Sequence, residues 1–183
     1  MHHPYGLRLR ERLQHKLAST SIEIDIDALA GDRVVAGQYI PRLELRRTKE
    51  ALRYDWIIIQ GGGNDLIHGT KPEAIYEALK RVWRITLDSG ANVLALTVTE
   101  TADRIESVRA KYNALNKMVV NHKERGFYVA DVAGAVTWPE LSEDQRKIWD
   151  DGLHFTRLGY DMLGDAIADK LLLALSPPLT ANM

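Results

Sequence analysis

The chain is predicted to form an α/β fold, with a parallel sheet between two layers of helices. Short apolar runs alternate along it with amphipathic segments of helical period. Two of the runs, Asp55–Gln60 and Asn92–Val98, are apolar almost throughout, which is typical of parallel strands buried on both faces. No repeat, low-complexity stretch or linker interrupts the alternation, so residues 1–183 are interpreted as one domain.

The N-terminal part is predicted to contain two helices and two strands. In Tyr5–Ala18, leucines recur among charged residues, which favours a helix. In Ser21–Asp27, isoleucines alternate with acidic residues, which predicts a strand with one polar face near the edge of the sheet. Val34–Leu52 is expected to be a helix, with Pro41 either early in it or breaking it. Asp55–Gln60 ends at glycines and is predicted to be a buried strand.

The remainder of the chain continues the alternation. A proline at the first turn, helical spacing of apolar residues and a capping box formed by Ser142 and Gln145 mark the helices. Strands are expected at Asn92–Val98 and Gly126–Asp131. Helices are expected at Pro72–Leu87, Ala102–Lys123, Ser142–Trp149 and Phe155–Leu173.

Composition excludes several classes of protein. The formal net charge is −1, so nothing predicts binding to nucleic acid or to an anionic membrane surface. The chain has no cysteine, which excludes disulfides, thiolate catalysis and cysteine-bound zinc. No apolar run approaches the roughly 20 residues of a membrane span, and residues 1–5 lack the apolar core of a signal peptide. A cytoplasmic location is therefore expected, with no cofactor and no metal; the oligomeric state stays open.

Asp151 and His154 are the first candidate catalytic residues. They are three residues apart, directly before a predicted helix. An imidazole that acts as a general base needs a hydrogen-bonded partner to orient it, and an aspartate serves that purpose. The alternative is a structural or surface histidine.

The glycine run after the Asp55–Gln60 strand is the second candidate region. Glycines allow a close backbone approach and positive φ, and the Asn64 side-chain amide that follows can donate to an oxyanion. Gly31, in the turn after Ser21–Asp27, can offer a backbone N–H to the same oxyanion. The alternatives are ordinary turns, with Asn64 capping a helix, or nucleotide binding at residues 61–63. A phosphate loop is disfavoured because no Lys-Ser or Lys-Thr follows.

No serine is an obvious nucleophile. Because sites in open parallel sheets form beyond the carboxyl ends of the strands, a serine that precedes a strand lies at the wrong edge. That excludes Ser19, Ser21 and Ser89. Thr97 and Thr99 follow a strand, but nothing marks either of them as activated.

Three blocks in order resemble the SGNH hydrolases, the GDSL-type esterases and lipases. They are Gly31-Asp32, Gly63-Asn64-Asp65 and Asp151-Gly152-Leu153-His154. The resemblance implies a three-layer α/β/α fold with a flavodoxin-like sheet and hydrolysis of small carboxylic esters. It also implies that His154 is the base, that Asp151 orients it, and that Gly31 and Asn64 form the oxyanion hole.

The resemblance has a gap at its start. The family's opening strand, which ends in Gly-Asp-Ser-Leu and carries the nucleophile, has no counterpart before His3-Pro4-Tyr5. The resemblance implies the strand order 2-1-3-4-5, so the missing strand would be central. We therefore expect four main strands, with a gap or a strained closure between Ser21–Asp27 and Asp55–Gln60. The chain is expected to be inactive or nearly so, and a non-catalytic or ligand-binding protein is the alternative.

Overall fold

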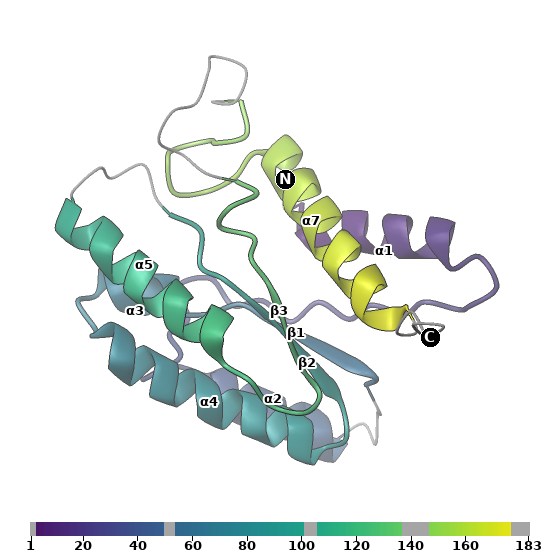
Figure 1. The fold of residues 1–183 in the computed structure, drawn as a ribbon, viewed down its shortest axis with the longest axis horizontal. Coiled ribbons are helices and arrows are strands. Elements are labelled where there is room, and N and C mark those ends of the chain that lie inside the picture. Colours follow the sequence, from purple (N-terminus) through teal and green to yellow (C-terminus); the bar gives the residue numbers. More distant parts are fainter. Residues whose placement is uncertain (1–2, 50–53, 101–105, 137–146, 177–183) are drawn as a thin grey trace, which may run out of the picture.

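The structure is a computed structural model that describes residues 3–49, 54–100, 106–136 and 147–176. Its strands are β1 (Trp56–Ile59), β2 (Asn92–Leu96) and β3 (Phe127–Ala130), all parallel, in the order β1-β2-β3. Its helices are α1 (Tyr5–Lys16), α2 (Tyr39–Lys49), α3 (Gly63–Ile67), α4 (Pro72–Asp88), α5 (Glu106–Asn121) and α7 (Arg157–Leu175). Helices α1 and α7 pack side by side on one face of the sheet, and α2, α4 and α5 cover the other (Figure 1). The predicted α/β/α architecture is confirmed.

The central strand β2 shows why the apolar runs are continuous. Val93 and Ala95 pack in the core on the α4 and α5 side, whereas Leu94 and Leu96 pack in the core on the α1 and α7 side. Successive side chains of a strand point to opposite faces, so a sheet covered on both faces requires apolar residues at every position. The strands predicted at residues 55–60, 92–98 and 126–131 are confirmed with slightly shorter bounds.

The strand predicted at Ser21–Asp27 is wrong. Among the described residues, no hydrogen-bonded ladder joins this segment to β1. The sheet therefore has three strands in the described part of the chain, where four were expected. Side chains hold the segment: Arg10 donates to the Ile24 carbonyl and Tyr54 donates to Asp25. A period-two pattern reports which side chains face the core, but a strand also needs a hydrogen-bonded neighbour. The predicted gap beside residues 55–60 accounts for the missing neighbour.

The outer edge of β1 is unpaired as a result. The N–H of Asn92 donates to the Asp55 carbonyl, and in a parallel ladder alternate residues bond the same neighbour. The backbone groups of Trp56 and Ile58 therefore point away from β2. Within the described part of the chain no strand pairs with them.

Helix α2 begins five residues later than predicted. Residues 34–37 form turns, and the Asp32 carboxylate accepts the N–H groups of Arg33 and Gln38 at the base of this loop. Pro41 is the third residue of the helix, where its missing N–H costs nothing. The predicted end at Leu52 lies outside the described residues.

The remaining differences lie at the two candidate regions. The short helix α3 was not predicted. Of the helix predicted at Ser142–Trp149, residues 142–146 lie outside the described residues, and residues 147–149 form a turn and a bridge between Trp149 and Phe155 instead. Helix α7 begins after Phe155 because the Thr156 hydroxyl accepts the Gly159 N–H as its N-cap.

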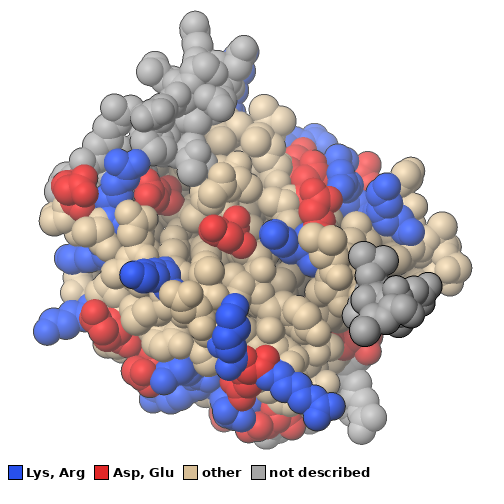
Figure 2. All heavy atoms as spheres, in the orientation of Figure 1, with Lys and Arg blue, Asp and Glu red and all other residues tan. Residues whose placement is uncertain are grey.

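Charges of both signs are mixed on the surface. On the face shown in Figure 2, lysine and arginine side chains lie among aspartate and glutamate side chains. This fits the net charge of −1. In the described residues no helix combines the length and apolarity needed to cross a membrane.

Candidate active site

The chain enters both candidate regions at the carboxyl edge of the sheet. The strands are parallel, so their carboxyl ends share one edge. The chain leaves β1 there into α3, and it leaves β3 there into the loops that precede α7 (Figure 1). Val136, Ile148, Trp149 and Phe155 form a small apolar cluster that ties these loops together. This is the edge where open α/β sheets bind ligands.

Asp151 and His154 form a direct hydrogen bond. Nδ1 of His154 lies 2.7 Å from Oδ2 of Asp151. The other carboxylate oxygen accepts the backbone N–H groups of Leu153 (2.9 Å) and His154 (2.7 Å). Gly152, with φ of 82°, allows the tight turn that brings the pair together. The carboxylate thus fixes the imidazole through Nδ1 and leaves Nε2 without a partner among the described residues.

This pair is exposed in the described structure. The side chains of His154 and Asp151 are 63% and 55% accessible. No described residue hydrogen-bonds Nε2 of His154, so this nitrogen can take a proton from a hydroxyl group that approaches it. The hydrogen bond from His154, followed by the two backbone N–H groups, holds the pKa of Asp151 well below its usual range.

We expect Asp151 to remain ionised as the pH falls through the ordinary aspartate value of 3.8. Because its pKa in the folded protein is lowered, the contact stabilises the fold above that value and is lost only as the pH falls through the lower folded pKa. Carbon-13 NMR of the Asp151 carboxyl should show the lowered midpoint. In His154→Ala the midpoint should move up toward 3.8, but not fully, because two N–H donors remain. A native midpoint at 3.8 would contradict the geometry.

Asn64 and the Gly31 loop also lie together. Asn64 is the second residue of α3, and its Nδ2 donates to the Asp32 carbonyl oxygen at 3.0 Å. Gly31 has φ of 73°, and no atom lies within 4 Å of where a Cβ would be. The Asn64 amide therefore contacts the backbone of the residue that follows Gly31. No hydrogen bond joins this pair to His154 among the described residues; the shared edge of the sheet relates them.

The glycine run serves close packing as well as conformation. A Cβ at Gly61 would lie 2.6 Å from Val34, and one at Gly62 would lie 2.9 Å from both Ile75 and Leu115. Gly62 also has φ of 109° and is the N-cap of α3. The close approach that these glycines permit is thus to the protein's own core, which sets where α3 and Asn64 lie.

Replacing Gly62 with alanine should destabilise the protein more than the same change at Gly69. Both residues have positive φ (109° and 82°), but no atom lies within 4 Å of a Cβ at Gly69. Gly69→Ala should cost roughly 1–2 kcal/mol for the left-handed backbone. Gly62→Ala should cost about 1–3 kcal/mol more for overpacking. Urea unfolding of both variants measures the difference, and equal losses would contradict the packing at Gly62.

Several of the described hydroxyl groups form hydrogen bonds away from His154. Ser89 donates to the Thr86 carbonyl at the end of α4, and Ser176 donates to the Leu172 carbonyl. Thr97, at the carboxyl end of β2, is fully buried; it donates to Asp131 and accepts the Ala133 N–H. The sequence contains no Gly-Asp-Ser. None of these three hydroxyl groups hydrogen-bonds His154.

Two carboxylates of the site carry more contacts than the sequence indicated. Asp65 is fully buried and accepts two backbone N–H groups. Asp32 accepts two others and pairs with Arg42 at 3.2 Å. Both follow the predicted oxyanion donors directly in sequence. The partners of Asp65 lie about 30 positions away in the chain, which spacing does not reveal, whereas those of the Asp32 carboxylate lie within ten residues of it.

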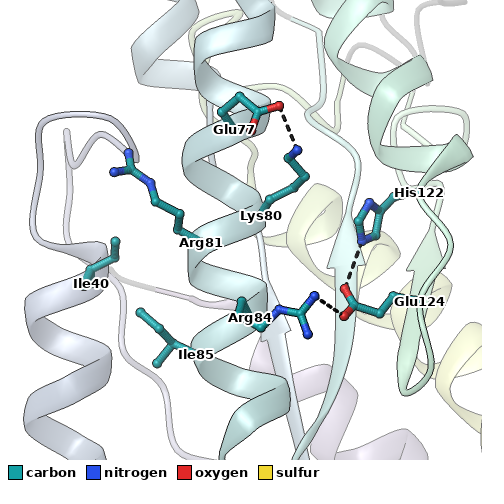
Figure 3. A pocket seen from close by; sticks show the side chains of 8 residues that line it. All are labelled: Ile40, Glu77, Lys80, Arg81, Arg84, Ile85, His122 and Glu124. Atoms are coloured by element: carbon teal, nitrogen blue, oxygen red, sulfur yellow. Dashed lines mark hydrogen bonds and ion pairs between the residues drawn. The ribbon is translucent and has the colours of Figure 1, made fainter.

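A hollow elsewhere on the surface is lined by charged side chains of both signs. It measures about 540 Å³ and lies along α4 (Figure 3). Lys80 pairs with Glu77 at 2.8 Å and Arg84 pairs with Glu124 at 2.6 Å. Arg81 also lines the hollow and has no ion pair among the described residues. No cluster of three or more metal-ligating side chains occurs within the described ranges.

The family model for the GDSL-like lipase/acylhydrolase family matches residues 2–162. The chain belongs to this family. No curated protein matches it significantly. The family assignment confirms the resemblance carried by the three sequence blocks.

Solved structures with the same fold include other GDSL-like and esterase proteins. A GDSL-like lipase from Parabacteroides merdae aligns with a TM-score of 0.71 and 16% identity, over 92% of this chain and 82% of its own. An acetyl-xylooligosaccharide esterase from Geobacillus Stearmophilus aligns with a TM-score of 0.69 and 15% identity, over 92% of this chain and 80% of its own. A carbohydrate esterase of family 3 from Talaromyces cellulolyticus aligns with a TM-score of 0.67 and 15% identity, over 93% of this chain and 90% of its own. At these identities the likeness establishes the fold of this GDSL-like chain.

Proposed function

We propose that this site belongs to a serine esterase that hydrolyses small carboxylic esters. The observation that carries the proposal is the 2.7 Å contact between Asp151 and His154, which orients an imidazole with Nε2 open. His154 would take the proton of an attacking hydroxyl and later return it to the leaving alcohol. Asp151 would hold the ring and stabilise its charged form. The family assignment supports this chemistry.

Gly31 and Asn64 would stabilise the tetrahedral intermediate. The backbone N–H of Gly31 and the side-chain amide of Asn64 would donate to the oxyanion that forms when the carbonyl is attacked. The contact between Asn64 and Asp32 supports this, because Asp32 directly follows Gly31 in the chain. Neither donor carries a charge, so each would stabilise the oxyanion by dipole alone.

The nucleophile would come from a strand that pairs with the open edge of β1. The outward backbone groups of Trp56 and Ile58 support this, and so does the expected central position of the family's first strand. A strand there would end at the carboxyl edge, from which the loop that carries His154 also emerges. Water would then release the acyl group from the serine, with His154 again acting as the base.

The test is to add a strand ending in Gly-Asp-Ser-Leu before Met1 and to assay hydrolysis of an aryl acetate. Acetate esters are the first choice because the Geobacillus neighbour is an acetyl-xylooligosaccharide esterase. Asn64→Ala in the extended protein should lower kcat by roughly 10²–10³. Replacing the added serine with alanine is the control. A folded extended protein without turnover would contradict the proposal.

A second candidate is a non-catalytic protein that binds small ligands at the same edge. The lack of a Gly-Asp-Ser sequence and of a hydroxyl contact to His154 among the described residues favours it. The same experiment separates the two functions, because a binding protein gains no turnover from the added strand.

A further inference from the structure

A buried carboxylate lies beside the proposed oxyanion donors and takes no part in the proposed chemistry. Asp65 follows Asn64 in α3 and is 0% exposed. Its Oδ2 accepts the N–H of Val34 at 2.8 Å, and its Oδ1 accepts the N–H of Val35 at 3.0 Å. A buried carboxyl group is costly unless it is hydrogen-bonded. The described residues offer Asp65 no ion pair, so these two backbone donors are its principal compensation.

The two hydrogen bonds fasten a loop to helix α3. Val34 and Val35 lie in the loop that starts at Gly31, whereas Asp65 lies in α3. A third bond, from the Asn64 Nδ2 to the Asp32 carbonyl, runs in the opposite direction between the same two segments. Adjacent residues of α3 thus contact the loop as acceptor and as donor, which fixes both the separation and the rotation of the two segments.

The third bond also orients the Asn64 amide. A side-chain amide nitrogen carries two hydrogens. One of them is directed at the Asp32 carbonyl, which leaves the other for a ligand and fixes the plane of the group. If the loop moved away from α3, Asn64 would lose this partner and Gly31 would move with the loop.

We infer that Asp65 is a positioning residue, whose carboxylate sets the separation between the Gly31 N–H and the Asn64 amide. The catalytic importance of that separation rests on the proposed function, whereas the contacts themselves do not depend on it. Asp65 acts through other groups and touches no substrate. Its role is to keep the two donors preorganised, which is the source of oxyanion stabilisation in a site of this kind.

Asp32 provides a useful contrast. Its carboxylate accepts the N–H groups of Arg33 and Gln38 and pairs with Arg42, all within residues 32–42. It therefore shapes the loop internally. The Asp65 carboxylate instead joins the loop to α3. Loss of Asp32 contacts should loosen the loop, whereas loss of Asp65 contacts should separate the loop from Asn64.

The test is amide NMR on the 183-residue chain, comparing the native protein with Asp65→Asn. Hydrogen exchange of the Val34 and Val35 amides should become faster by on the order of tenfold or more, as expected for local opening. The Gly31 amide and the Asn64 side-chain amide should also shift. Asn64→Ala assigns the side-chain signal.

The control is Val119→Ala, which removes volume from the same core cluster but lies in α5, outside the loop and α3. It should lower stability and leave the Asn64 signal in place. If Asp65→Asn does not fold, Asp65→Glu, which keeps the charge on a longer arm, should show the same shifts to a smaller extent. An unchanged Asn64 signal in a variant that has lost protection at Val34 and Val35 would overturn the inference. No ester is involved, so failure of the hydrolysis assay would count against the proposed function alone.

Discussion

The purified 183-residue chain is expected to hydrolyse an aryl acetate no faster than a Ser-His-Asp enzyme from which the nucleophilic serine has been removed. Removing the nucleophile from a Ser-His-Asp site costs roughly 10⁶ in kcat and leaves only about 10³–10⁴ over water. This chain has the imidazole of His154 and the Asn64 amide, but no hydroxyl within hydrogen-bonding distance of Nε2 among its described residues. Steady-state assays at high enzyme concentration measure the residual rate.

Non-additivity gives a sharper form of the same result. Groups that act as one catalytic unit do not lose activity independently. His154→Ala should therefore change the residual rate of the 183-residue chain very little. In the strand-extended protein the same substitution should lower kcat by roughly 10³ or more. The usual turnover of enzymes is about 1 s⁻¹ or faster. If the 183-residue chain reached that rate and His154→Ala abolished it, the chain would have to contain a nucleophile.

Trp83→Ala is expected to lower the free energy of unfolding by about 3–5 kcal/mol, the usual cost of deleting a buried aromatic residue. Trp83 is 1% exposed, and its ring centre lies 4.7 Å from that of Phe127 and 5.0 Å from that of His122. Its indole N–H has no hydrogen-bond partner among the described residues. The loss is therefore one of packing alone. Urea unfolding measures it.

Tyr128→Ala is the matched control on β3. Tyr128 packs against Trp56 with ring centres 4.9 Å apart but is 39% exposed. Its loss should cost roughly 0.5–1.5 kcal/mol, the range of a single aromatic pair. Trp83→Phe should cost less than Trp83→Ala, because it keeps a ring in the cavity and removes the unpartnered N–H. A loss below about 1.5 kcal/mol for Trp83→Ala would contradict its place at the centre of the core.

The buried strands could be predicted because their pattern has one physical cause. Residues 92–98 are apolar at almost every position since helices cover both faces of β2. Residues 21–27 have an equally clear period, and Ile22 and Ile24 do pack against the core. They still form no strand, because the ladder depends on a neighbour that the local pattern does not describe.

In the candidate site, too, local contacts could be predicted from the sequence and contacts between distant residues could not. The contact between Asp151 and His154 is local, so a spacing of three residues in a turn was enough to predict that they could meet. The contact between Asn64 and Asp32 joins residues 32 positions apart. The positions of both blocks agree with the family resemblance, but no sequence spacing indicates that Asp65 would be buried against the same loop. Burial of a charged group is decided by tertiary packing.

The open edge of β1 has a consequence for how the chain behaves in concentrated solution. An unsatisfied row of N–H and C=O groups is a template for any extended chain, including the same edge of another copy. The backbone groups of Trp56 and Ile58 form that row, while their side chains pack against the core on the α1 and α7 side. Natural proteins protect such edges with lysines, prolines or bulges, and the run from Trp56 to Ile59 has none of these. We therefore expect the concentrated chain to self-associate through this edge, and a strand paired with it to suppress that association.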